Sequence, residues 1–579
     1  SAPPRRRELR IRHLREPAVI GLLAATANGR RNAAHLAGAW PDTRFYEGKA
    51  KEALHRAWNE CDGVVLFLAT GAAVRLVAPL LESKHRDPGV VTVDDAGNFA
   101  VALCGGHEGG ANALAARVAE TLGGTPVITT ASDAVGIPAL DSLGDKLGFR
   151  LEGDSDLASV GAAIVSGEKV SLVTDRRWPL GPLPENVVRT DEWEAPLVLI
   201  SDRLVEMPRP AVVFRPPSLV AGVGCSRGVD AKEIIDLLLH SLAQAALTEK
   251  SIAALASIDL KRDEAGLLQA AEKLDVPIHF HPAEVLSVVE APNPSELVRE
   301  AVGTPSVAEA AVVSSGAELV LEKRKSANAT VAIGRLPVRG RLALVSLGPG
   351  EHTLIPPLAR EAIGSSEFIV GLDQYVGRIR HLLRPGTRVL TPPLGKEVER
   401  AQLALAEARL GGSVALVSSG DVGIYAMGSP ALELAEEDVE VVVVPGVTAA
   451  QAAASLLGSP LGHDHCSVSL SDLLTPWEVI QARIRAAAEG DFVVSLYNPR
   501  SKGRDWQLGK VKEILLEHRP PDTPVGIVKD AYRPTQRAIL TDLASLRPED
   551  VDMLTIVLVG SSQTRVVAGR MVTPRGYLS

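Results

Sequence analysis

The sequence predicts a multidomain α/β protein, and three observations support this. Short apolar runs rich in β-branched residues alternate with Ala- and Leu-rich amphipathic stretches, which is the pattern of βα units around parallel sheets. The chain has 579 residues, too many for one hydrophobic core. Apolar residues make up 46% of it and aromatic residues only 3%, so the cores must be built from aliphatic side chains.

The clearest elements follow one another along the chain in this alternation. Apolar, β-branched runs favour strands because such side chains suit a pleated, buried surface. They predict strands at Val64–Ala69, Phe99–Cys104, Leu342–Leu347, Val414–Ser418, Val439–Val444 and Phe492–Tyr497. Amphipathic stretches predict helices between them, at Ala111–Leu122, Asp230–Ala246 and Glu397–Ala408.

Domain boundaries are expected where this alternation breaks. Prolines crowd the stretches 177–183 and 208–217, and a basic stretch, 322–341, precedes a fresh strand. We therefore expect three α/β regions, a linker and a C-terminal α/β region. Their predicted bounds are 1–149, 150–215, 216–325, 326–340 (the linker) and 341–579.

Composition excludes several classes of protein. The formal net charge is −9, and basic residues are scattered without interleaved aromatics, so we expect no nucleic-acid partner. No run approaches 18 apolar residues without a charge or turn, so we expect no membrane span and a cytoplasmic location. Four cysteines lie far apart without a CxxC pair, which predicts no metal centre: Cys61, Cys104, Cys225 and Cys466.

Three strands of the C-terminal region run directly into turns that suit a small ligand. The first, Leu342–Gly350, ends in a tight glycine turn, and the second, Val417–Gly428, carries Asp421. The third, Val444–Gln451, places Thr448 at the start of a helix, where hydroxyl and amide groups can bind a ligand. An acidic group beside open amides suits an amino-acid or ribose moiety better than a phosphate. Three such turns in order are far more specific than one.

With these turns, the segment from about 341 to 579 resembles the tetrapyrrole methyltransferase family. The resemblance implies a two-lobed α/β fold that binds S-adenosylmethionine in the cleft between the lobes. Tyr497–Arg504, Gly526–Gln536 and Met553–Thr564 are similar to the precorrin-3B C(17)-methyltransferases, which also contract the ring. The cofactor contacts implied are Pro349, Ser419, Gly420, Asp421, Ile424, Thr448, Ala449, Asn498, Ala531 and Thr555. Val422 stands where the family usually has a proline.

Methyl transfer mainly requires alignment of donor and acceptor, whereas ring contraction calls for some acid–base help. Asp421 and Lys529 are the catalytic candidates in this region. Arg500, Arg504 and Arg533 are candidates to bind the acetate and propionate carboxylates of the macrocycle. For each of these residues a surface or purely structural role remains the alternative.

In the N-terminal half, a glycine-rich turn with His107 and Glu108 opens a predicted helix, and its amides favour an anionic group. On local grounds alone, Asn112 caps this helix and His107 is a loop residue. His107–Asn112, Ile128–Asp133, Gly222–Gly228 and Leu255–Lys261 resemble the cobalt-precorrin-5A hydrolase family, over about residues 15–335. That family opens a lactone and releases acetaldehyde. His107 is then a general-base candidate and Glu108 a second one.

The same resemblance suggests Arg75, Asn112 and Arg227 as substrate contacts. Three alternatives stay open: the N-terminal half is a non-catalytic binding module, the methyl group goes to another ring carbon, or the macrocycle is metal-free instead of carrying cobalt. A full-length hydrolase-like half favours the cobalt route. The expected partners are a tetrapyrrole substrate and a second copy of the chain, paired through the methyltransferase region.

Overall fold

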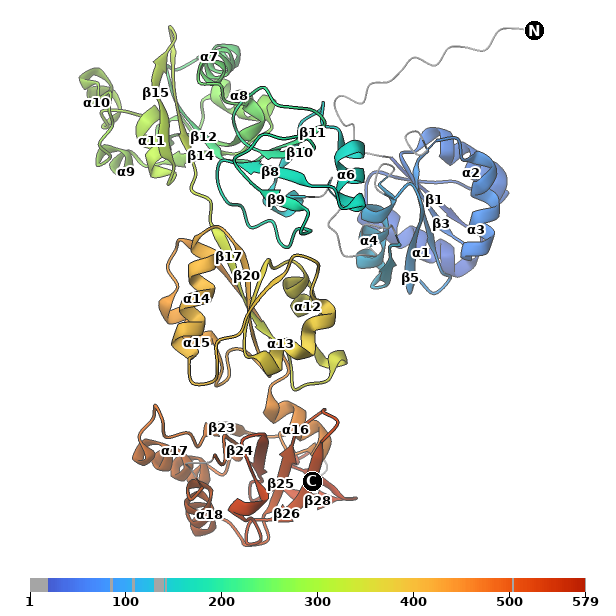
Figure 1. Cartoon of the computed structure of the whole chain (residues 1–579), viewed down its shortest axis with the longest axis vertical. Coiled ribbons are helices and arrows are strands. Elements are labelled where there is room, and N and C mark those ends of the chain that lie inside the picture. The colour runs from blue at the N-terminus through green and yellow to red at the C-terminus, as the bar shows by residue number, and fades with distance from the viewer. Residues whose placement is uncertain are drawn as a thin grey trace. The chain divides into compact units, whose positions relative to one another are not determined.

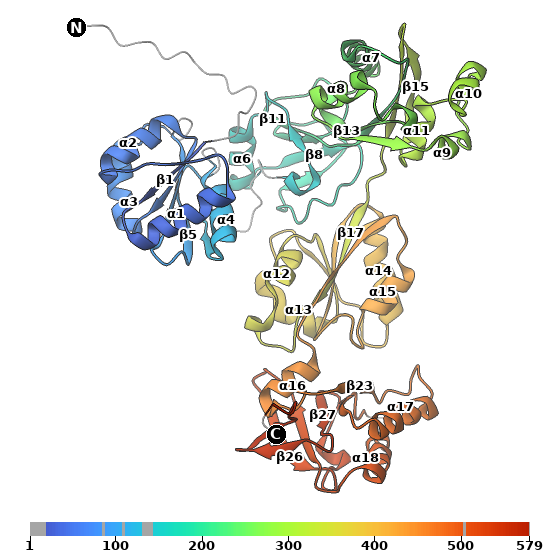
Figure 2. The ribbon, with the colours of Figure 1, turned by 180° about the vertical axis from the view of Figure 1, so that it is seen from behind.

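The computed structural model describes residues 19–83, 87–106, 110–129, 140, 143–501 and 505–577 (Figure 1). The chain divides into two compact units. The first holds the described residues up to Leu143 together with helix α6 (Leu157–Ser166), and the second holds Gly144–Asp156 and everything from Gly167 onward. Every sheet is combined with helices, as Figures 1 and 2 show, so the predicted multidomain α/β class is confirmed.

The first unit is built on a six-stranded sheet in the order β2-β1-β3-β4-β5-β6, parallel except between β4 and β5. Its strands are β1 (Ile20–Ala24), β2 (Thr43–Phe45), β3 (Gly63–Phe67), β4 (Gly89–Val93), β5 (Phe99–Cys104) and β6 (Thr125–Val127). Its further helices are α1 (Ala27–Ala39), α2 (Ala50–Glu60), α3 (Thr70–Val77) and α4 (Ala111–Leu122). Strand β5 and helix α4 have the bounds predicted from the sequence. Aliphatic side chains such as Leu22, Val65 and Val91 are fully buried in its core.

Two further sheets open the second unit. The middle sheet runs β7-β11-β10-β8-β9, and the next runs β14-β13-β12-β16-β15. The middle strands are β7 (Arg150–Leu151), β8 (Val170–Thr174), β9 (Val187–Arg189), β10 (Leu197–Ile200) and β11 (Ala211–Arg215). The next sheet has β12 (Leu219–Cys225), β13 (Ile252–Ile258), β14 (Ile278–His281), β15 (Glu318–Lys325) and β16 (Ala329–Arg335). Its helices are α7 (Ala231–Gln244), α8 (Ala265–Leu274), α9 (Ala283–Ser287), α10 (Glu296–Val302) and α11 (Ala308–Ser314).

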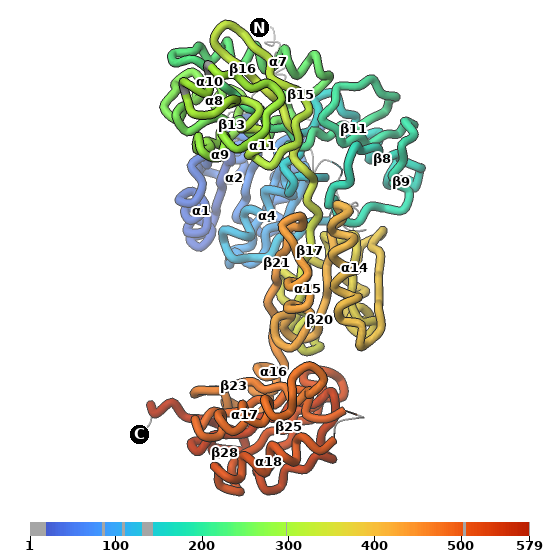
Figure 3. The backbone as a smooth tube through the Cα atoms, turned by 90° about the vertical axis from the view of Figure 1, so that its left-hand side faces the viewer, coloured from blue at the N-terminus to red at the C-terminus, as the bar shows by residue number. Residues whose placement is uncertain are grey.

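The linker expected at 326–340 is largely a strand instead. Strand β16 pairs antiparallel with β12 along its whole length, and Val331, Ala332 and Ile333 are fully buried. Half of the basic residues that suggested a linker lie on the neighbouring edge strand β15, where charged side chains can reach water. The chain then passes from β16 directly into β17 (Gly340–Ser346), the start of the next sheet (Figure 3).

The C-terminal region has two lobes, as the resemblance implied. The first lobe is a parallel sheet in the order β19-β18-β20-β17-β21. Besides β17 it contains β18 (Phe368–Val370), β19 (Arg388–Leu390), β20 (Ser413–Ser418) and β21 (Val439–Val444). Helices α12 (Pro357–Gly364) and α13 (Asp373–Ile379) cover one face, and α14 (Glu397–Arg409) and α15 (Gly428–Leu434) cover the other (Figure 1).

The second lobe is a mixed sheet in the order β23-β24-β27-β25-β26, with a small three-stranded sheet beside it. Its main strands are β23 (His465–Ser469), β24 (Val493–Tyr497), β25 (Pro524–Lys529), β26 (Arg537–Asp542) and β27 (Thr555–Val559). The small sheet has β22 (Gly458–Ser459), β28 (Arg565–Val567) and β29 (Arg570–Val572), and the helices are α16 (Ala449–Leu457), α17 (Trp477–Glu489) and α18 (Gln507–His518). Among the described residues, no helix has the length and apolar character needed to cross a bilayer.

The proline-rich segment 177–189 of the middle region docks against the first lobe. Arg177 Nη2 lies 3.0 Å from Glu367 Oε1, and Arg189 Nη2 lies 3.5 Å from Glu367 Oε2. The backbones also approach closely, since a Cβ on Gly386 would lie 1.7 Å from the Leu183 carbonyl oxygen. Glu367 directly precedes β18, so the docked segment meets the amino ends of the strands in this sheet.

We predict that Glu367→Gln destabilises the second unit by roughly 3 kcal/mol, because it leaves the partly buried Arg189 without a carboxylate and Arg177 with only Glu407, at 3.6 Å. Urea unfolding of the full-length protein, followed by circular dichroism, measures the effect. The matched control is Glu361→Gln, which breaks the pair between Lys146 and Glu361. That pair also joins the middle region to the lobe, but its side chains are 67% and 58% exposed, so the loss should stay below about 1 kcal/mol. Equal losses in both variants would contradict the docking role of Glu367.

Candidate functional site

A cavity of about 620 Å³ lies between the two lobes of the C-terminal region, at the carboxyl ends of β17, β20 and β21. Parallel strands bring their following turns to one edge of a sheet, which is why segments far apart in sequence meet here. All the residues that the resemblance assigned to the cofactor line this cavity. They are Pro349, Ser419, Gly420, Asp421, Ile424, Thr448, Ala449, Asn498, Ala531 and Thr555.

The first two turns are joined through their backbones. Gly348 donates its N–H to the Gly420 carbonyl at 3.1 Å, and Gly420 donates to the Gly348 carbonyl at 2.8 Å. Both glycines have positive φ values, +69° and +70°, which side chains disfavour. The glycines of the sequence motif are therefore required by the way these two turns pair.

Asp421 holds the second and third turns together. Its Oδ1 accepts the N–H of Gly423 at 2.8 Å, and its Oδ2 accepts the N–H of Gly446 at 2.9 Å. Each carboxylate oxygen thus accepts a backbone hydrogen bond, and together they hold the two turns in place. Val422 donates its N–H to Ser346 Oγ at 2.8 Å. Valine thus makes a backbone hydrogen bond here that a proline, which has no N–H, could not make.

Tyr497 links the second lobe to the third turn. Its hydroxyl lies 2.6 Å from Thr448 Oγ1 and accepts the N–H of Ala450 at 3.1 Å, at the start of α16. Burial raises the pKa of Tyr497, since the phenolate would be poorly solvated there. Its ring also lies 5.0 Å from that of Tyr425, so two aromatic rings form part of the cavity wall.

Strained backbone conformations gather around the cavity. Tyr425, Asn498 and Asp530 all line it and have φ values of 51°, 50° and 50°. Such left-handed conformations are costly for residues other than glycine and cluster at functional sites. The Asn498 amide donates to Ser469 Oγ at 3.0 Å, which fixes its side chain beside the cavity.

The predicted charged residues of this region fall into two groups. Arg533 lines the cavity, donating from Nε to the Pro349 carbonyl at 2.9 Å. Lys529, expected to be catalytic, instead pairs with Asp552 at 2.5 Å and is not part of the cavity wall. Asp552 also raises the pKa of Lys529, so its ammonium stays charged. Arg500 is likewise outside the wall and donates to the Pro548 carbonyl at 2.9 Å, and Arg504 lies outside the described residues.

Several cavity residues have no counterpart among the predicted ones. Tyr375 on α13 and Leu394 lie outside the three glycine turns, so none of those motifs marked them, and Met427 lies within the second turn but is not among the predicted contacts. Arg400 on α14 is only 2% exposed. It donates from Nη2 to the Pro393 carbonyl at 2.8 Å, and its Nη1 lies 3.4 Å from Met427 Sδ. A buried arginine in a helix reads as a surface residue from sequence alone.

In the N-terminal half, His107 and Glu108 lie outside the described residues. Arg75 is exposed on α3, with Nη1 3.5 Å from the Gly71 carbonyl. Asn112 is the second residue of α4, whose N-cap is Gly110, so Asn112 is not the helix cap. In the second unit, Arg227 is exposed and lies 3.6 Å from Asp263.

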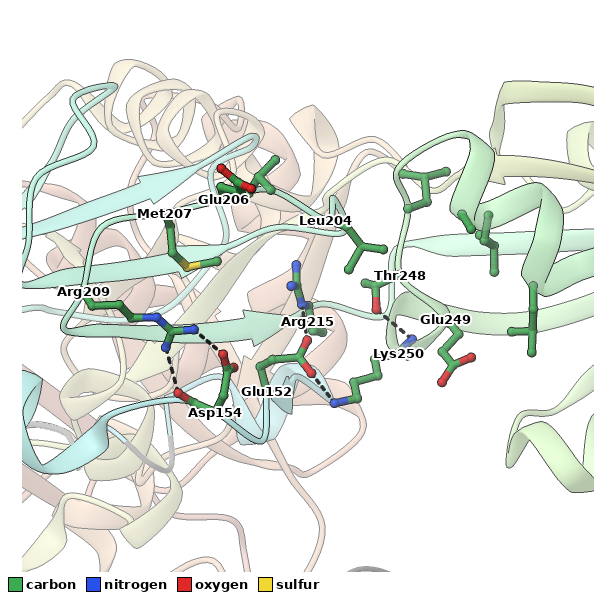
Figure 4. Close-up of a pocket in the computed structure, with 15 residues that line it drawn as sticks. Glu152, Asp154, Leu204, Glu206, Met207, Arg209, Arg215, Thr248, Glu249 and Lys250 are labelled. Carbon is green, nitrogen blue, oxygen red and sulfur yellow. Dashed lines mark hydrogen bonds and ion pairs between the residues drawn. The ribbon is translucent and has the colours of Figure 1, made fainter.

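A second pocket, of about 990 Å³, lies between the middle sheet and helix α7 (Figure 4). Its wall contains cations that are already paired. Arg215 donates from Nε to Glu152 Oε2 at 2.8 Å, Lys250 binds the other oxygen of Glu152, and Arg209 binds Asp154. Because these charges satisfy one another, we interpret this pocket as a groove at the joint between two sheets.

Comparison with protein families matches four regions of the chain. Residues 341–547 match the tetrapyrrole (corrin/porphyrin) methylases. Residues 52–133 match the cobalamin synthesis G N-terminal family, 138–216 the cobalamin biosynthesis central region, and 219–334 the cobalamin synthesis G C-terminus.

Individual proteins resemble the C-terminal region. The chain is 46% identical over 242 residues to a probable cobalt-factor III C(17)-methyltransferase of Salmonella typhimurium, covering 41% of this chain and 99% of that protein. It is 44% identical over 247 residues to a cobalt-factor III methyltransferase of Priestia megaterium, covering 42% of this chain and 46% of that protein. The chain thus spans about half the length of that second relative. The crystal structure of the methyltransferase CobJ is 39% identical with a TM-score of 0.39, covering 41% of this chain and 100% of that one.

Proposed function

Because this chain belongs to the tetrapyrrole (corrin/porphyrin) methylase family, we propose that residues 341–579 methylate ring carbon 17 of a precorrin-3B-type macrocycle with ring contraction. The observation that carries this proposal is the convergence of all the predicted cofactor residues on one cavity. The named relative that the chain covers almost completely is a C(17)-methyltransferase, which supports position 17. Both a metal-free and a cobalt-bound macrocycle fit this proposal, and we propose a homodimer paired through this region.

S-adenosylmethionine, the proposed cofactor, supplies an already activated methyl group. The residues of the cavity suit it, since they combine exposed backbone turns with the hydroxyl of Thr448 and the aromatic wall of Tyr425 and Tyr497. The task of the chain is then alignment. Asp421 fixes the spacing of two turns and Tyr497 fixes the start of α16, so the groups that contact the ligand are held before it arrives.

The residues around the cavity offer few free groups for acid–base help. Asp421 is held by backbone amides. Asp530 is 7% exposed and accepts from Arg533 and Thr535. We therefore propose that pre-organisation, more than proton transfer by these carboxylates, supports the methyl-transfer step.

For the N-terminal half we propose hydrolysis of the lactone of a cobalt-precorrin-5A-type macrocycle, with release of acetaldehyde. The matches to three cobalamin synthesis families support this. His107 remains the proposed general base and Glu108 the second candidate. A non-catalytic module that only binds the macrocycle is the competing proposal.

The decisive experiment is incubation of the full-length protein with S-adenosylmethionine and either precorrin-3B or its cobalt counterpart. We expect one added methyl group at carbon 17 and a contracted ring, identified by mass spectrometry and NMR. The macrocycle that is methylated more efficiently shows whether the substrate is metal-free or carries cobalt. A methylated product with an uncontracted ring would remove ring contraction from the proposal.

We predict that Asp421→Asn weakens the binding of S-adenosylhomocysteine about tenfold, or 1.4 kcal/mol. The amide keeps one acceptor oxygen but cannot accept from both Gly423 and Gly446, so the turns lose their fixed spacing. Isothermal titration calorimetry measures the affinity. Asp438→Asn, which removes an exposed partner of Arg409 in the same lobe, serves as the control and should bind as the wild type does. Wild-type affinity in Asp421→Asn would contradict its positioning role.

We predict that His107→Ala abolishes acetaldehyde release from a cobalt-precorrin-5A substrate, while His55→Ala, at an exposed position on α2, releases it normally. A coupled alcohol dehydrogenase assay on the full-length protein measures acetaldehyde. Unaltered release by His107→Ala would exclude His107 as the base. No release by the wild type would favour the binding module instead.

A further inference from the structure

Helix α13 carries an arginine, Arg378, next to residues that line the cavity, and no part of the proposed function uses it. Gln374 and Tyr375 of this helix line the cavity, and Arg378 follows them by four and three positions, on the same face of the helix. The Arg378 guanidinium lies over the Tyr375 ring, 5.7 Å from its centroid. Arg378 is therefore held beside the cavity by an aromatic residue of its own helix.

Arg378 has no carboxylate of its own. Within the described parts of the chain, none of the ion pairs includes Arg378, whereas its neighbour Arg380 lies 3.9 Å from Asp373. Arg378 is half-buried. Burial lowers the pKa of Arg378 and the nearby Arg533 lowers it further, while Tyr375 and Asp530 oppose this. The charges around Arg378 are thus one arginine and one aspartate.

That aspartate is already engaged. Asp530 is 7% exposed, and its Oδ1 lies 3.2 Å from Arg533 Nη1 while its Oδ2 accepts from Thr535 Oγ1 at 2.9 Å. Arg533 also donates from Nε to the Pro349 carbonyl at 2.9 Å. Asp530 thus pairs with Arg533, and the positive charge of Arg378 beside them has no carboxylate of the described residues in contact with it. Partly buried charge without a partner is costly, so this arrangement favours an incoming anion.

A third arginine near the cavity also lacks a close carboxylate partner in the described part of the chain. Arg400 is 2% exposed, its nearest carboxylate is Glu397 at 3.9 Å, and its Nε has no hydrogen-bond partner in the described structure. It lines the same cavity as Tyr375 and Arg533. Glu397, which also lines the cavity, is 48% exposed and balances the charge of Arg400 only weakly at that distance.

We propose that Arg378 and Arg533 together bind one peripheral carboxylate of the macrocycle and so determine the orientation in which the ring enters the cavity. This rests on the proposed methyltransferase function. A carboxylate of the cofactor is the other source of the same chemistry. Helix α13 contributes none of the predicted cofactor residues, which favours the macrocycle. A guanidinium binds a carboxylate through two parallel hydrogen bonds, so it fixes orientation as well as adding affinity.

The test uses the full-length protein with two probes. Uroporphyrin, a tetrapyrrole with acetate and propionate side chains, is followed by fluorescence, and S-adenosylhomocysteine is followed by calorimetry. Arg378→Gln is expected to bind uroporphyrin about tenfold more weakly and S-adenosylhomocysteine as the wild type does. Arg378→Lys, which keeps the charge but not the paired hydrogen bonds, should fall between. Arg380→Gln, an exposed arginine two positions along, is the matched control and should change neither affinity.

The outcomes separate the inference from the function on which it rests. Equal uroporphyrin affinity in Arg378→Gln and Arg380→Gln overturns the inference and leaves the proposed function intact. Weaker S-adenosylhomocysteine binding with unchanged uroporphyrin binding assigns the carboxylate to the cofactor, which also overturns it. A wild-type protein that binds S-adenosylhomocysteine but no uroporphyrin contradicts the proposed substrate class, and the inference falls with it. Unchanged S-adenosylhomocysteine affinity also verifies that Arg378→Gln is folded.

Discussion

The two hydrogen bonds that Asp421 accepts from Gly423 and Gly446 are the interaction on which the C-terminal cavity depends. Parallel strands bring the turns after β17, β20 and β21 to one edge, but the sheet does not fix the conformation of the turns beyond the strand ends. The carboxylate links two of these turns, and the paired backbones of Gly348 and Gly420 attach the third. Tyr497 then ties the second lobe to the same frame. Asp421, which the sequence suggested as a catalytic residue, is the side chain that holds the turns in place.

Sequence reasoning succeeded where a local pattern determines structure. Strands β5 and β21 and helix α4 have their predicted bounds, because apolar runs or amphipathic periods end there at glycines, prolines or charges. It failed where charge was taken as a sign of exposure along a whole segment. In the 326–340 stretch, basic residues occur beside buried ones. Val331 and Ile333 are fully buried and place β16 inside a sheet.

The same distinction between local pattern and tertiary packing applies to the residues of the candidate site. The glycine turns were recognisable because their conformation restricts the residue type, and they meet at one cavity. Tyr375 and Arg400 were not recognisable, since their helices have ordinary compositions and only tertiary packing brings them to the wall. Lys529 shows the converse. Its position in a family motif suggested catalysis, but its ammonium group forms an ion pair with Asp552 from the loop before β27.

The docking of segment 177–189 also bears on how the two halves cooperate. Glu367 and Gly386 lie at the amino ends of β18 and β19, whereas the cavity opens at the carboxyl ends of the same sheet. Strand β20 spans six residues, or about 20 Å between these two edges. The cavity and the docked segment of the middle region therefore lie at opposite edges of this sheet. Covalent fusion guarantees equal numbers of the two halves and keeps them near each other. It does not by itself place the docked segment next to the cavity.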